Sequence, residues 1–156
     1  MQRRAALTPR GFSLLELVLV LGIVGVVAGV AAPRLTGATM RYRVALTARR
    51  IAADLGLAQS WARTSSKNQT VAFDAAGTGY RMTGVRTLDN RSWNYEVSFG
   101  SDPHQITLVS VDFGGDPNVV FDAYGAPDSG GTVVIRADGT QKTITLDAYT
   151  GKANLQ

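Results

Sequence analysis

The stretch Arg10–Pro33 is the most apolar part of the chain, and it constrains the fold more than any other. Residues 12–32 run for 21 positions with a single charged side chain, the carboxylate of Glu16. At about 1.5 Å per residue, a helix of this length covers roughly 31 Å, which matches a hydrocarbon core about 30 Å thick. The sequence therefore predicts a transmembrane helix over residues 12–33.

Two ordinary explanations of this segment leave Glu16 without a purpose. A secretory signal peptide would be cleaved near Ala32, but its apolar region would be shorter, and Pro33 follows that position directly. A plain membrane anchor needs no carboxylate near the start of its apolar run, where a charge is expensive. A carboxylate in lipid requires a cation or hydrogen-bond donors, and a neighbouring helix is one source of them.

The run Gly-Phe-Ser-Leu-Leu-Glu, which begins at Gly11, resembles the class III signal of type IV prepilins and pseudopilins. The resemblance implies that residues 1–11 are a basic leader, which a prepilin peptidase removes on the cytoplasmic face. Phe12 would then become the N-methylated first residue, and Glu16 would direct assembly with other pilins or pseudopilins. Pro33 stands where the family tends to carry a proline. The implied location is the bacterial inner membrane, crossed once, with the distal domain in the periplasm.

Three glycines, Gly22, Gly25 and Gly29, recur at spacings of three and four inside the apolar segment. They would line one face of a helix, where small residues permit close contact with another helix. Glycine is also generally common in membrane helices, so the spacing leaves both explanations open. Together with Pro33, these glycines are the candidate helix-packing positions.

Residues 34–67 continue the helical pattern as an amphipathic segment. Apolar residues recur there at spacings of three and four, and they are Val44, Ala48, Ile51, Leu55, Ala58 and Ala62. We therefore expect one helix from about Phe12 to Ser66, with its second half packed on a sheet and Trp61 packed in the core at the boundary between helix and sheet. Four arginines lie between residues 41 and 50, namely Arg41, Arg43, Arg49 and Arg50. They are expected to face solvent or anionic lipid headgroups, and a specific anion site is the alternative.

Residues 68–156 read as short β runs separated by turn residues. The expected strands are 70–74, 80–85, 93–99, 106–112, 119–122, 132–137 and 142–147. Asp138-Gly139 predicts a tight hairpin, and Trp93, Tyr95 and Phe99 share one strand face expected in the core. One helix followed only by strands predicts an α+β fold, in which a long N-terminal helix packs on an antiparallel sheet, as in pilins.

The distal half extends the resemblance. The segments Ile51–Ser66 and Val119–Asp122, followed by Gly125, resemble the GspH/FimT family, as do the last hairpin and Thr150-Gly151-Lys152. That family comprises minor pseudopilins of type II secretion and minor pilins of type IV pili. The resemblance implies a structural subunit of a type II secretion pseudopilus, in which the protein serves protein transport. The alternative is a minor type IV pilin that binds DNA for uptake.

The charge distribution makes DNA an unlikely partner. Residues 34–67 carry seven bases and one acid, whereas residues 68–156 carry six bases and ten acids. DNA binding requires exposed bases that neutralise phosphates. Family members credited with DNA binding resemble one another in an arginine-rich C-terminal tail, whereas residues 150–156 here contain one base, Lys152.

No residue pattern points to catalysis, a metal or a cofactor. The chain has no cysteine, which excludes disulfides and thiolate chemistry, and its single histidine, His104, is expected in a surface loop. Four aspartates lack the tight alternating spacing of a calcium loop and are more typical of turns, namely Asp112, Asp116, Asp122 and Asp128. We therefore expect a protein that is not an enzyme.

Overall fold

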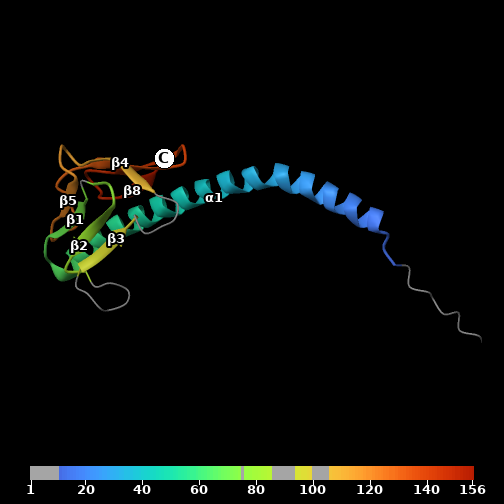
Figure 1. The fold of residues 1–156 in the computed structure, drawn as a ribbon. Coiled ribbons are helices and arrows are strands. Elements are labelled where there is room, and N and C mark those ends of the chain that lie inside the picture. Colours follow the sequence, from blue (N-terminus) through green and yellow to red (C-terminus); the bar gives the residue numbers. More distant parts are fainter. Residues whose placement is uncertain (1–10, 75, 86–93, 100–105) are drawn as a thin grey trace, which may run out of the picture. The chain divides into compact units, whose positions relative to one another are not determined.

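The computed structural model (Figure 1) describes residues 11–74, 76–85, 94–99 and 106–156, and the side chains of residues 30–39 are outside that description. One helix, α1 (Leu14–Ser65), covers 52 residues. This confirms the single helix expected from about Phe12 to Ser66. The chain divides into two compact units, Met1–Gly37 and Ala38–Gln156, and α1 contributes to both.

In the first unit, every described side chain from residue 11 to residue 29 is exposed. Most of these side chains are apolar, so this part of α1 builds no core of its own. Within the described residues, no helical segment combines the length and the apolar character needed to cross a membrane. The membrane span expected at residues 12–33 therefore stays a prediction.

In the second unit, the described chain forms eight strands after α1. They are β1 (Gln69–Phe73), β2 (Gly79–Thr83), β3 (Asn94–Ser98), β4 (Thr107–Asp112), β5 (Asn118–Phe121), β6 (Gly131–Ala137), β7 (Thr140–Leu146) and β8 (Ala153–Leu155). Seven match the expected strands within two residues at either end. The sequence analysis missed β8, because three residues without a β-branched or aromatic side chain show no strand pattern.

The strands form two antiparallel sheets where the sequence analysis expected one. Sheet 1 has the order β3-β2-β1-β5, and sheet 2 has the order β4-β6-β7-β8. The division arises because β5 leaves its chain neighbour β4 and pairs with β1, with Val71 opposite Val119. Strand β4 then pairs with β6 in the second sheet. The β6–β7 hairpin turns at Asp138 and Gly139, whose φ values of 44° and 74° confirm the tight turn.

The core lies between the second half of α1 and the two sheets, and all of its residues belong to the unit Ala38–Gln156. All six residues of the expected helix stripe are buried, from Val44 to Ala62. Tyr95 and Phe99 are buried as expected, whereas Trp93 lies outside the described residues. Trp61, expected to pack in the core at the boundary between helix and sheet, is not a core residue, because it lies at the flank of the stripe and is 37% exposed.

Candidate assembly site

The start of α1 holds the residues that the sequence singled out for processing and assembly. Gly11 and Phe12 precede the helix and are exposed, and the Ser13 carbonyl accepts the first helical hydrogen bond from Leu17 N–H at 3.1 Å. Ser13 and Glu16 have the spacing of a capping box, in which the two side chains bond each other's backbone. Within the described residues neither side chain makes that bond, so helix capping does not account for Glu16.

The glycine face of α1 has no partner inside the described chain. An added Cβ at Gly22, Gly25 or Gly29 would meet nothing within 4 Å. The described part of the chain therefore gives no steric reason for glycine at these positions, and contact with another helix would use the small residues. Pro33 is helical in its backbone, and α1 continues through it.

The four arginines between residues 41 and 50 differ in exposure and in bonding. Arg41 and Arg49 are exposed and Arg43 is half-buried. Arg50 is half-exposed and also bonds within the domain, because its Nη2 donates to the Tyr95 hydroxyl at 3.3 Å and its Nε lies 3.9 Å from the Asp54 carboxylate. The hydrogen bond to Tyr95 raises the pKa of the Arg50 guanidinium, which therefore stays charged.

A buried polar network on Asp54 attaches α1 to sheet 1. Asp54 is 8% exposed, and one of its oxygens accepts hydrogen bonds from the Tyr80 hydroxyl and, at 3.0 Å, from the Tyr95 hydroxyl. Burial, followed by the bond to Asp54, raises the pKa of Tyr80 far above its usual range. Sequence reasoning missed this network, although Asp54 is the only acid among the seven bases of residues 34–67.

A second set of contacts attaches the end of α1 to two turns. The Gln59 side-chain amide donates to the carbonyl oxygens of Gly125 and Thr150, each at 2.8 Å. Arg63 Nε donates to the Tyr124 carbonyl at 2.9 Å. Glycine lets the turn at Gly125 lie close against α1, since an added Cβ there would be 2.2 Å from Arg63 Nε. Gly151 is equally confined, and both glycines have positive φ.

Aspartate side chains build these turns. Asp122 accepts hydrogen bonds from the backbone N–H groups of Tyr124 and Ala126, and Asp147 does so from Tyr149 and Thr150. The N–H and hydroxyl of Thr150 lower the pKa of Asp147 below its ordinary value. Asp112, Asp116 and Asp128 likewise accept backbone N–H groups nearby in the fold. His104 lies outside the described residues.

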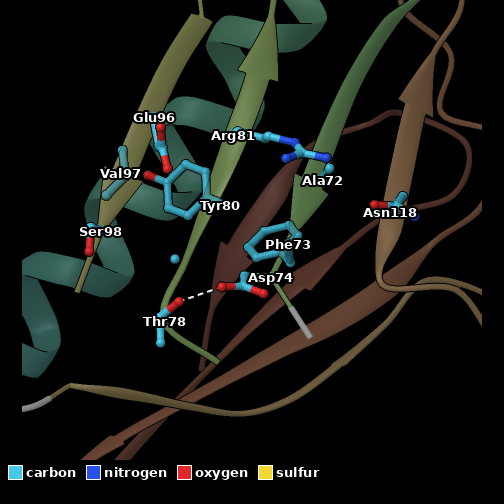
Figure 2. A pocket seen from close by; sticks show the side chains of 11 residues that line it. Ala72, Phe73, Asp74, Thr78, Tyr80, Arg81, Glu96, Val97, Ser98 and Asn118 are labelled. Atoms are coloured by element: carbon cyan, nitrogen blue, oxygen red, sulfur yellow. Dashed lines mark hydrogen bonds between the residues drawn. The ribbon is translucent and has the colours of Figure 1, made fainter. Parts of the chain in front are cut away.

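A polar cavity of about 290 Å³ lies on the face of sheet 1 turned away from the core, with α1 behind the strands (Figure 2). Strand register places Glu96, Arg81, Ala72 and Asn118 in one row across it. Ala72 contributes only a small side chain to this row, and Gly79 lets β2 approach the backbone of β3 closely. An added Cβ at Gly79 would lie 2.1 Å from the Val97 carbonyl oxygen.

The β1–β2 turn closes one end of this cavity. Thr78 donates its hydroxyl to the Asp74 carboxylate, as Figure 2 shows, and Ala76 N–H donates to the same carboxylate at 3.1 Å. These two bonds lower the pKa of Asp74, so the carboxylate is ionised near neutral pH. Carboxylates, hydroxyls and one guanidinium here can bind a polar or charged group.

A long helix with an exposed apolar first half, joined to a two-sheet domain, is the architecture of a pilin-like subunit. A crystal structure of the type IV minor pilin FimU from Pseudomonas aeruginosa matches this fold with a TM-score of 0.58. The match covers 76% of this chain and 91% of that chain at 16% sequence identity. It confirms the pilin-like α+β fold.

The family model for the type II transport protein GspH matches residues 47–151, well over half of the chain. A second model, the prokaryotic N-terminal methylation motif, matches residues 9–32. The chain therefore belongs to the GspH family, as a prepilin-like minor pseudopilin or pilin. No curated protein matches it.

Proposed function

We propose that the protein is a structural, non-enzymatic minor pseudopilin that assembles into the pseudopilus of a type II secretion system. The observation that carries the proposal is the exposure of every described apolar side chain in the first half of α1. The one carboxylate there, Glu16, makes no hydrogen bond or ion pair within the described chain. An exposed apolar helix surface of this extent marks a site of contact with a membrane or with another protein. The inner membrane provides this contact before assembly, and neighbouring helices provide it in the filament.

Processing at Gly11 prepares the membrane-bound subunit for assembly into the filament. Cleavage after Gly11 frees the α-amine of Phe12, a cation about one helical turn from Glu16. When a second helix lies alongside with an axial offset, the Glu16 carboxylate of one subunit pairs with that amine of its neighbour. Such a pair fixes register, as buried polar groups do in coiled coils. In the membrane-bound state, Arg41 and Arg43, which follow the apolar segment in the sequence, contact anionic headgroups.

The processing step has a direct test. The full chain, expressed with a prepilin peptidase, should lose residues 1–11 and gain one methyl group at Phe12, which intact-mass measurement detects. Gly11→Leu should remain uncleaved and unmethylated. Phe12→Leu, a matched control that keeps the glycine, should still be cleaved. An unprocessed wild-type chain would contradict the proposal.

Secretion is favoured over DNA uptake by the charge of residues 68–156. This region is net acidic, and Lys152 is the only base in the C-terminal segment that follows Gly151. A gel-shift assay with the full chain in detergent, at low and moderate salt, separates the two functions. We expect no salt-sensitive shift. A shift that Lys152→Ala abolishes would instead favour a DNA-binding type IV pilin.

A further inference from the structure

Strand β3 presents an unpaired carboxylate to the cavity on sheet 1. Glu96 is exposed, and its carboxylate makes no hydrogen bond or ion pair among the described residues. The strand register sets Arg81 of β2 directly opposite it, a position in which opposite charges attract each other. The Arg81 guanidinium instead lies over the small side chain of Ala72, on the side away from Glu96 (Figure 2). The β3 side of the cavity therefore holds a carboxylate without a bonded cation.

Negative charge and oxygen acceptors predominate in this cavity. Glu96 and Asp74 each contribute a carboxylate, and Ser98 contributes a hydroxyl. The two carboxylates outnumber the guanidinium of Arg81, so the residues that line the cavity carry a net negative charge. The group that fits is a cation with several N–H donors. A guanidinium meets this requirement best, because its donors lie in one plane and pair with a carboxylate through two parallel hydrogen bonds.

The size of the cavity favours a side chain of a docked protein over a free ligand. Pockets for small molecules measure about 300–1,000 Å³, are mainly apolar and enclose most of the ligand. This cavity measures about 290 Å³, and its lining is mainly polar. A free cation would therefore lose its translational and rotational freedom in exchange for little buried surface. For a side chain, the rest of the protein interface offsets that loss.

The cavity opens on the side of sheet 1 opposite to α1. Tyr80 and Tyr95 point from the sheet toward α1 and bond Asp54. Side chains alternate along a strand, so Arg81 and Glu96 point to the other face. Contacts that the second half of α1 makes with other molecules therefore leave the cavity open. A protein that does not pack on α1 can reach it.

We propose that the cavity binds an arginine side chain on the surface of a protein that is not a filament subunit, with the guanidinium against Glu96. The inference rests on the proposed function, in which α1 carries the contacts with other subunits, and it names the chemistry of a further partner. Charge complementarity selects arginine, because the cavity is net acidic and its exposed carboxylate lacks a cation. The planar guanidinium pairs with Glu96 and donates to the Ser98 hydroxyl.

A peptide titration of the full chain in detergent tests the site. The probe is the blocked tripeptide acetyl-Gly-Arg-Gly-amide, and the amide NMR shifts of Gly79 and Ser98 follow its binding. We expect saturable shifts at both positions. The same peptide with citrulline in place of arginine has nearly the same shape without the charge, and it should cause none. Equal shifts with the citrulline peptide, or no shifts with the arginine peptide, would overturn the inference.

Charge variants separate binding in the cavity from general attraction to an acidic surface. Glu96→Gln should weaken binding of the arginine peptide at least threefold. Arg81→Gln should strengthen it at least twofold, because a competing cation is removed from the cavity. The matched control Asp138→Asn removes a carboxylate from the exposed β6–β7 turn and should leave the affinity unchanged. A loss at Asp138→Asn as large as that at Glu96→Gln would overturn a specific site.

A free guanidinium compound distinguishes a docked side chain from a small ligand. Ethylguanidinium lacks the flanking peptide groups and should bind at least threefold more weakly than the arginine peptide. Equal affinity would overturn the assignment to a protein side chain. If the arginine peptide fails to bind while assembly still depends on Glu16, this inference falls and the proposed function stands. If assembly ignores Glu16, the proposed function falls, and the titration still decides whether the cavity binds a guanidinium.

Discussion

The first and second halves of α1 differ in the contacts that their side chains make. In the second half, six apolar positions from Val44 to Ala62 are buried, and Asp54, Gln59 and Arg63 bond the sheets and turns. In the first half, side chains are exposed and three glycines have open space around them. One continuous helix thus serves two purposes. Its distal half folds the domain, and its proximal half is available to other molecules.

The largest effect on folding is expected in the distal half, at Asp54. Asp54→Ala removes the acceptor of two buried phenols and leaves Arg50 without its carboxylate. The expected loss is roughly 2–5 kcal/mol in the free energy of unfolding, since each buried hydroxyl left without an acceptor costs about 1–3 kcal/mol. Urea unfolding of the full chain in detergent, followed by tryptophan fluorescence, measures it.

The control for Asp54 is Arg50→Ala, which removes a half-exposed partner and should cost less. Equal stability of Asp54→Ala and the wild type would show that the network does not hold α1 on sheet 1. Membrane association of both variants should be unchanged, because the proposed function assigns it to the proximal half.

A pair of glycine substitutions compares the two halves directly. Gly125→Ala should destabilise the domain by about 1–3 kcal/mol, because φ is +79° and the new Cβ would meet the Arg63 side chain. Gly25→Ala should leave the unfolding midpoint unchanged, because its Cβ meets open space. The same urea titration compares both variants. A destabilising Gly25→Ala would show that the proximal half packs within its own chain.

The smallest effect is a pH dependence at Asp147. Its pKa is lowered in the folded state, so its contribution to stability is complete above the unfolded value of about 3.9 and is lost as pH falls through the folded value. Asp147→Asn should therefore reduce stability slightly at pH 7 and flatten its decline below about pH 4. Thermal unfolding from pH 7 to pH 3 checks this. An unaltered pH profile would contradict the role of the Thr150 hydrogen bonds.

Periodicity made the fold largely predictable. The helix, its core stripe and seven strands follow from local patterns that short-range geometry enforces. The division into two sheets was not predictable in this way, because the pairing of β1 with β5 joins segments nearly 50 residues apart in the chain. The burial of Trp61 was not predictable, because a residue at the flank of a buried helix stripe can point toward the core or toward solvent.

The candidate site was predictable only where a linear motif carries it. Gly11, Phe12 and Glu16 lie within six consecutive residues, so a motif could single them out. Asp54 could not be assigned to the interior, because its partners Tyr80 and Tyr95 come from distant strands. The cavity of sheet 1 depends on the register that aligns Glu96 with Arg81. Such features arise from tertiary pairing and leave no local pattern.

The most direct test of the division within α1 is Glu16→Leu in the full chain. The fraction of tagged protein that co-purifies with partner pilins should fall at least tenfold, while membrane insertion and the urea midpoint of the β domain remain at wild-type values. Leucine keeps the helix and its apolar surface and removes only the carboxylate. Undiminished co-purification, or a shifted unfolding midpoint, would contradict an assembly role for Glu16 that is separate from folding.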